Sequence, residues 1–79
     1  MPQVIKDLNA APVNGIFCSS SSQPENSPLL NGSVSWIVGY TASVNNTSDF
    51  LVQIVYAYDK QEIYHRIKAN DIWNEWNQL

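Results

Sequence analysis

The central strand of the chain is predicted by the segment Phe50-Leu51-Val52-Gln53-Ile54-Val55-Tyr56-Ala57-Tyr58. In an extended segment, successive side chains point to opposite faces, and here both faces carry apolar or aromatic side chains. A strand that is apolar on both faces is typical of the middle of a sheet. We therefore expect residues 50–58 to have a neighbouring strand on each side.

One neighbouring strand is predicted upstream, where large side chains alternate with small or polar ones. The large side chains belong to Val34, Trp36, Val38 and Tyr40. This two-residue period is typical of a half-buried strand. Residues 45–48, which contain two asparagines and a serine, then supply a turn that leads into the central strand.

The other neighbouring strand is predicted downstream, over residues 62–68. Residues 59–61 are short enough to close a hairpin onto it. The alternation places Ile63, His65 and Ile67 on one face and Tyr64, Arg66 and Lys68 on the other. We expect the face that carries Tyr64 and Arg66 to point outward.

Shorter elements complete the chain. Residues 15–19 form a predicted strand. Residues 20–33, which contain two prolines and one glycine among serines and asparagines, form a long predicted loop that crosses one face of the sheet. Residues 7–9 start a single helical turn that Pro12 halts. The final segment, residues 72–79, is predicted as a strand, with a two-turn helix as the alternative.

These patterns predict an all-β fold with a minor helical turn near the N-terminus. The expected architecture is a small, knob-like, antiparallel twisted sheet or sandwich of four to six strands. Residues 1–14 are expected to be a lead-in segment and residues 15–79 a single β domain. The residues expected in the core are Trp36, Val38, Val52, Ile54, Tyr56 and Trp73.

The composition argues against several classes of function. The net charge is −3, and the four bases, at positions 6, 60, 66 and 68, form no stripe that could bind phosphates, so nucleic acid is not an expected partner. No apolar run approaches the ~18 residues of a membrane span, so we expect no membrane insertion. One cysteine and one histidine provide neither an internal disulfide nor a usual zinc site, and we expect no metal and no cofactor.

The sequence also lacks a recognisable catalytic arrangement. Cys18 and His65 lie in separate predicted strands, and the carboxylates are spread singly along the chain. We therefore expect the protein not to be an enzyme. A domain of 79 residues buries a small core, so oligomerisation is the expected source of additional stability.

The aromatic and amide residues near the C-terminus are the best candidates for binding a ligand. A tryptophan ring can stack on the apolar face of a sugar, while amide and guanidinium groups pair with its hydroxyls. Strand alternation puts Trp73 toward the core and Trp76 on the opposite face. The candidate ligand-binding residues are Trp76, Tyr64, Arg66, Asn74 and Gln78. The alternative is that Trp76 packs on a neighbouring strand or subunit.

The order and spacing of these landmarks resemble the pyocin-knob family, whose members are small β domains at or near the ends of phage tail fibres and R-type pyocin fibres. The resemblance covers most of the chain. It rests on Asp7-Leu8-Asn9, Gly15-Ile16-Phe17, Asn26-Ser27-Pro28, Val52-Gln53-Ile54, Ile63-Tyr64-His65-Arg66 and Trp73-Asn74-Glu75-Trp76-Asn77-Gln78-Leu79.

The resemblance implies a homotrimeric knob domain of a phage receptor-binding protein, made in the cytoplasm of the bacterial host and carried on the virion as part of a tail fibre. Its implied partners are other copies of the chain, the rest of the fibre and a bacterial surface glycan that it holds during host adhesion. The alternative is a structural trimerisation or capping module of a fibre or depolymerase, with no ligand of its own.

Overall fold

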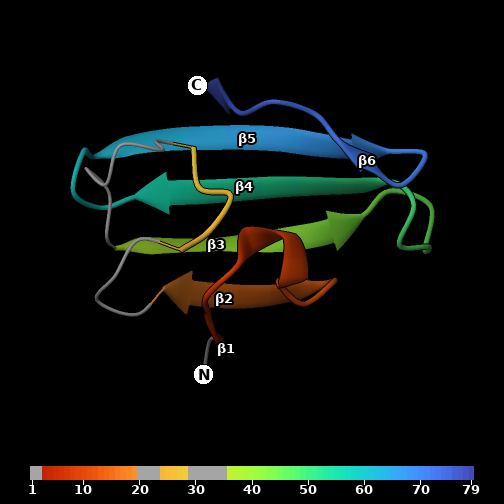
Figure 1. The fold of residues 1–79 in the computed structure, drawn as a ribbon, viewed down its shortest axis with the longest axis horizontal. Helices are drawn as coiled ribbons and strands as arrows, with labels where there is room; N and C mark the ends of the chain where they lie inside the picture. The colour runs from red at the N-terminus through yellow and green to blue at the C-terminus, as the bar shows by residue number, and fades with distance from the viewer. Residues whose placement is uncertain (1–2, 20–23, 29–35) are drawn as a thin grey trace.

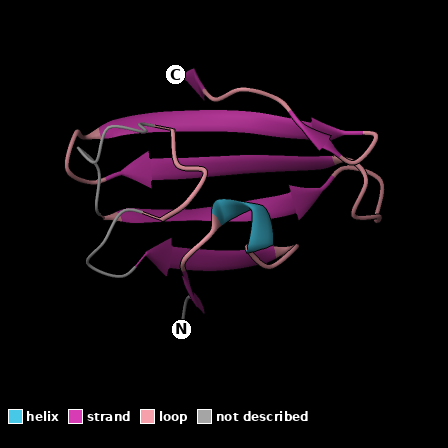
Figure 2. Cartoon of the chain, in the orientation of Figure 1, coloured by secondary structure: helices cyan, strands magenta, loops and turns pink. Residues whose placement is uncertain are grey.

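The structure is a computed structural model that describes residues 3–19, 24–28 and 36–79 (Figure 1). Its strands are β1 (Gln3–Ile5), β2 (Gly15–Ser19), β3 (Ile37–Ser43), β4 (Leu51–Ala57), β5 (Glu62–Ala69), β6 (Ile72–Trp73) and β7 (Asn77–Gln78). In the described ranges the helical structure is one 3-10 turn, η1 (Leu8–Ala10), drawn in cyan in Figure 2. The prediction of an all-β fold with a helical turn near the N-terminus is confirmed.

All the strands belong to one sheet, in the order β1-β2-β3-β4-β5-β6, and β7 also pairs with β5. The β1–β2 pair is parallel and every other pair is antiparallel. The predicted central strand is therefore confirmed, because β4 lies between β3 and β5. Most of the predicted loop 20–33 and the predicted strand start at Val34 lie outside the described residues.

The turns form where the sequence predicts them, and several use a left-handed backbone. The β4–β5 hairpin closes through Gln61 at φ 55°, and the β3–β4 connection contains Asn46 at φ 64°. Between β5 and β6, Asn70 and Asp71 have φ values of 51° and 66°, the pair of positive angles that a tight hairpin turn requires. Asparagine and aspartate tolerate this conformation better than most residues.

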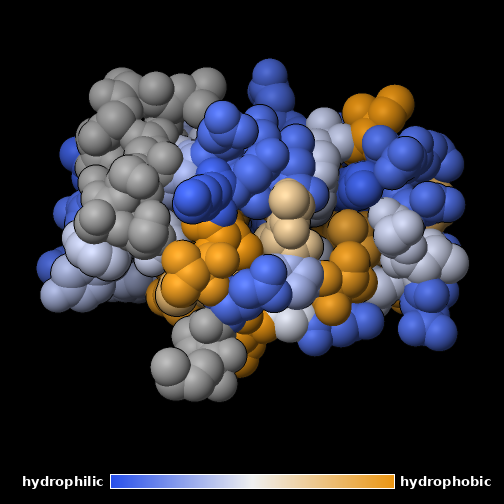
Figure 3. Space-filling model, turned by 60° about the horizontal axis from the view of Figure 1, so that its bottom comes forward, coloured by the Kyte–Doolittle hydropathy of each residue, from blue (hydrophilic) through white to orange (hydrophobic). Residues whose placement is uncertain are grey.

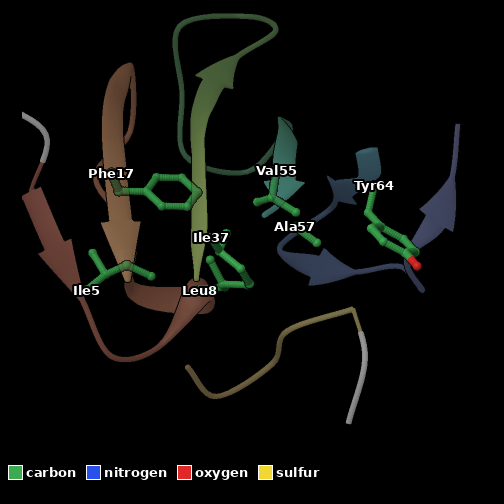
Figure 4. Close-up of a cluster of buried hydrophobic side chains, with 7 residues drawn as sticks. All are labelled: Ile5, Leu8, Phe17, Ile37, Val55, Ala57 and Tyr64. Carbon is green, nitrogen blue, oxygen red and sulfur yellow. The ribbon is translucent and has the colours of Figure 1, made fainter. Parts of the chain in front are cut away.

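One face of the sheet, which we call the covered face, lies under η1 and the segment 24–28 (Figure 1). Its buried apolar cluster consists of Ile5, Leu8, Phe17, Ile37, Val55, Ala57 and Tyr64. In Figure 4 these side chains gather on one side of the sheet, with Leu8 reaching the cluster from η1 and Tyr64 at its end. Two of the seven, Ile5 and Leu8, come from the segment predicted as a lead-in.

The core prediction was wrong about which face is buried. Trp36, Val38 and Tyr56 are exposed, and Val52, Ile54 and Trp73 are only half-buried. The covered face instead buries three polar side chains that lie directly opposite one another across β3, β4 and β5, namely Thr41, Gln53 and Arg66. The reason is positional, because η1 and the segment 24–28 lie over the less apolar side of the strands.

The opposite side of the sheet, which we call the open face, carries the more apolar set of side chains. Its strand residues are Val4, Ile16, Cys18, Val38, Tyr40, Ala42, Val52, Ile54, Tyr56, Ile63, His65, Ile67, Ala69, Ile72 and Asn77. Figure 3 turns the β1 edge of the sheet toward the viewer, and there apolar side chains are interrupted by polar ones.

Candidate functional site

The candidate site is organised by Arg66, a buried cation on the covered face of β5. Only 5% of the residue is exposed. Its Nε–H donates to Gln53 Oε1 at 2.8 Å, and its Nη2 donates to Asn9 Oδ1 at 2.8 Å. These charge-assisted hydrogen bonds replace the solvation that the guanidinium loses on burial.

Gln53 connects this cation to the rest of the covered face. Its Nε2 donates to Thr41 Oγ1 at 3.0 Å and to the Leu8 carbonyl at 2.8 Å. Because Thr41, Gln53 and Arg66 are cross-strand neighbours, the network crosses β3, β4 and β5 and then reaches η1. Each side-chain atom in these hydrogen bonds has a partner. A buried polar network whose atoms are paired stabilises one arrangement of the side chains.

Two tryptophan rings also lie against the guanidinium. Arg66 Cζ lies 3.9 Å from the ring centroid of Trp73 and 4.5 Å from that of Trp76. Lys68 Nζ lies 5.6 Å from the Trp73 centroid. A cation over an indole face, shielded from water, is worth roughly 2 kcal/mol.

The expected division of roles between the two tryptophans was wrong. Both are half-buried and both contact Arg66. Strand alternation does not extend across them because β6 ends at Trp73 and β7 begins at Asn77, leaving residues 74–76 outside any strand. The helical alternative for residues 72–79 is also wrong, since β6 and β7 are both extended.

The electrostatic environment of Arg66 is set mainly by burial. Loss of solvation lowers the pKa of its guanidinium to about 10, and the negative charge of Asp7 opposes this shift. At neutral pH the side chain remains protonated. Arg66 therefore presents a permanent positive charge at the base of the site.

The segment 24–28 is fastened across the site by hydrogen bonds. Leu8 N–H donates to the Glu25 carbonyl at 3.0 Å, and Asn26 Nδ2 donates to Asp7 Oδ1 at 2.7 Å. The indole N–H of Trp76 donates to the Asn26 carbonyl at 2.8 Å. These contacts bring the segment and the C-terminal tryptophan together over Arg66.

An open hollow of about 370 Å³ lies between these elements. It is lined by Asn26, Ser27, Pro28, Arg66, Glu75 and Trp76. This volume lies near the lower end of the range for small-molecule sites, about 300–1,000 Å³. The hollow combines an aromatic ring with amide, carboxylate and guanidinium groups, which is the chemistry that a small polar ligand with an apolar face requires.

The structure separates the five residues that the sequence proposed for ligand binding. Arg66 and Trp76 line the hollow, although Arg66 is buried and not outward as expected. Tyr64 is likewise buried, with 7% of its surface exposed, and so is not outward either. Asn74 and Gln78 are exposed, and neither lines the hollow.

Tyr64 and Gln78 meet at a different group, the carboxylate of Glu62. The Tyr64 hydroxyl donates to Glu62 Oε1 at 2.8 Å, and Gln78 Nε2 donates to Glu62 Oε2 at 2.9 Å. The hydrogen bond to Glu62, burial and the charge of Glu62 together raise the pKa of the Tyr64 phenol. These contacts fasten β7 to β5.

Sequence reasoning missed four lining residues of the hollow for which no strong signal exists, namely Asn26, Ser27, Pro28 and Glu75. It also missed Gln53, for which a signal does exist. A single amide in the middle of an otherwise apolar central strand must find partners when it is buried. Gln53 therefore marked the covered face as the one with a polar network.

The geometry of the sheet separates the residues considered for nucleophilic catalysis. Cys18 lies on β2 and His65 on β5, with β3 and β4 between them. At about 4.8 Å between adjacent strands, the two backbones are roughly 14 Å apart. Within residues 3–19, 24–28 and 36–79, no three His, Cys, Asp or Glu side chains are placed to hold a metal ion.

Comparison with family models, curated proteins and solved structures gave no match. The function of the candidate site is therefore inferred from its own geometry and chemistry.

Among the described residues, no helix has the length and apolar character needed to cross a membrane.

Proposed function

We propose that this chain is a non-catalytic binding module whose hollow holds a sugar unit of a bacterial surface glycan. The observation that carries the proposal is the placement of the Trp76 ring beside Asn26, Glu75 and Arg66 around one open hollow. A half-exposed indole can stack on the C–H face of a pyranose, and the polar groups can pair with its hydroxyls.

The resemblance to the pyocin-knob family extends this proposal to a biological setting. In that setting the module is the adhesive knob of a phage tail fibre, and several copies on one fibre engage one cell surface. Repeated engagement multiplies a weak affinity at each single site.

The proposal is tested by binding to an array of bacterial lipopolysaccharide and capsular saccharides, followed by titration of the strongest saccharide. Trp76→Ala is expected to weaken binding about 100-fold because it removes the stacking ring, and Glu75→Gln about fivefold because it removes one charged acceptor. Asp49→Asn is the matched control, since this exposed carboxylate lies outside the hollow and its loss should leave affinity unchanged.

The variant Glu75→Gln distinguishes a loss of saccharide binding from a loss of folding. Trp76 packs against the core cluster, so its loss affects stability as well, whereas Glu75 is exposed. Absence of saccharide binding by the wild-type chain, or equal affinities for Glu75→Gln and Asp49→Asn, would contradict the glycan proposal.

A structural role is the second candidate, and it is favoured by a specific observation. The Nε and Nη2 donors of Arg66 and the indole N–H of Trp76 already have partners within the chain. We propose that, if no saccharide binds, the module serves to cap or assemble a larger fibre. Misassembly of the parent fibre when residues 1–79 are deleted would support that role.

A further inference from the structure

The open face is an apolar surface spread over four adjacent strands. Six of its large side chains are substantially exposed, with exposed fractions of 62% for Ile16, 44% for Val38, 44% for Tyr40, 38% for Tyr56, 39% for Ile63 and 45% for Ile67. Antiparallel sheets with one solvated face usually place polar side chains on that face. Here the solvated open face carries apolar side chains, while the polar side chains of Thr41, Gln53 and Arg66 are buried on the covered face beside the apolar cluster.

The strand register makes these side chains neighbours. One row runs straight across the sheet through Ile16, Tyr40, Ile54 and His65. A second row runs through Cys18, Val38, Tyr56 and Ile63. Trp36 and Tyr58 extend the surface at one end, where Tyr58 N–H donates to the Trp36 carbonyl at 2.9 Å.

The exposed apolar area of the open face is as large as the largest apolar patches on monomeric proteins. Four half-exposed aromatic residues contribute roughly 400 Å², and four half-exposed aliphatic residues contribute roughly 200 Å² more. The sum, about 600 Å², is at the upper end of the largest patch on a typical monomer. Together with the half-buried residues between them, it approaches the roughly 800 Å² that each partner contributes to a stable interface.

The chemistry of the open face indicates what kind of partner covers it. Among its described strand residues there is no Asp, Glu, Lys or Arg, and the polar groups are two tyrosine hydroxyls, one thiol, one imidazole and the amide of Asn77. A glycan needs amide or charged groups to pair with its hydroxyls, and this surface offers few. A surface without charge, in contrast, can meet an identical surface without placing like charges opposite one another.

We propose that the open face packs against the open face of another copy of this chain. Sheets that pack face to face lie about 10 Å apart and bury their inner side chains between them. The hollow at Trp76 is on the covered face and stays accessible in this arrangement. The proposal therefore stands on different residues from the glycan site and does not depend on it.

The test is the mass of the full chain in solution, measured by sedimentation equilibrium over a wide range of concentration. We expect the mass of an assembly of two or more chains, and we expect Tyr56→Lys to weaken association about 100-fold because it buries an unpaired charge at the interface. Val13→Lys is the control, because Val13 is exposed in the connection between η1 and β2 and should leave the mass unchanged. A single-chain mass for the wild type at every concentration would overturn the proposal.

A second measurement needs no substitution and so is independent of folding defects. In a mixture of isotope-labelled and unlabelled wild-type chains, intermolecular nuclear Overhauser effects are expected at the rings of Tyr40 and Tyr56. Intermolecular contacts confined to other surfaces, such as the edge strands, would show that copies associate in another way and would overturn the proposal. If the wild-type chain associates as expected but binds no saccharide, the glycan proposal is contradicted and the proposal for the open face stands.

Discussion

Arg66→Met is expected to lower the free energy of unfolding by about 3 kcal/mol, because it removes the cation around which the covered face is organised. The methionine keeps much of the side-chain volume but leaves Gln53 Oε1, a fully buried acceptor, without its donor. It also removes the cation that lies against the rings of Trp73 and Trp76. Urea denaturation followed by tryptophan fluorescence measures the change.

Two further variants define what this result means. Lys60→Met removes an exposed cation in the β4–β5 turn and is expected to change stability by less than about 0.5 kcal/mol. Arg66→Lys keeps the charge but cannot reproduce the planar fork, so it should recover only part of the loss. Equal stabilities for Arg66→Met and Lys60→Met would contradict the role assigned to Arg66.

Gly39→Ala is expected to destabilise the fold by about 3 kcal/mol or more, because β4 passes too close to β3 at this position. A Cβ on Gly39 would overlap the carbonyl oxygen of Ile54 and would lie 2.9 Å from the Cα of Val55. Both obstacles are backbone atoms of the central strand, so relief requires separating paired strands. Thermal unfolding followed by circular dichroism measures the loss.

Gly15→Ala is the matched control for that substitution. There a Cβ would lie 3.3 Å from the side-chain carbons of Pro12, a contact that a small shift relieves. We expect a change of about 1 kcal/mol or less. Equal thermal stabilities of Gly39→Ala and Gly15→Ala would contradict the close approach of β3 and β4 at Gly39.

The strands and their connections could be predicted from the sequence because side-chain alternation and turn residues are properties of short segments. Alternation predicted β3, β4 and β5, and short turn segments predicted their connections. Alternation also identified which residues share a face. It could not identify which face is covered, because that depends on where η1 and the segment 24–28 pack. The more apolar face was expected to be the core, and it is the open face.

The candidate site was partly predictable for a similar reason. Arg66 and Trp76 were proposed as binding residues from their chemistry, and both line the hollow. Their shared environment was not predicted, because it depends on the end of β6 at Trp73. Asn26 reaches the site through contacts with Asp7, which lies 19 positions away in the chain, and no local pattern reports such a contact.

The most direct test of the arrangement on the covered face is nuclear magnetic resonance of the Arg66 side chain in the wild-type protein. The Nε–H of an exposed arginine exchanges rapidly with water, whereas this one is buried and donates to Gln53. We predict a protected Arg66 Nε–H resonance at neutral pH, with nuclear Overhauser effects from the side chain to the indole rings of both Trp73 and Trp76. A rapidly exchanging Nε–H without contacts to either ring would contradict the buried placement of Arg66 between Gln53 and the two tryptophans.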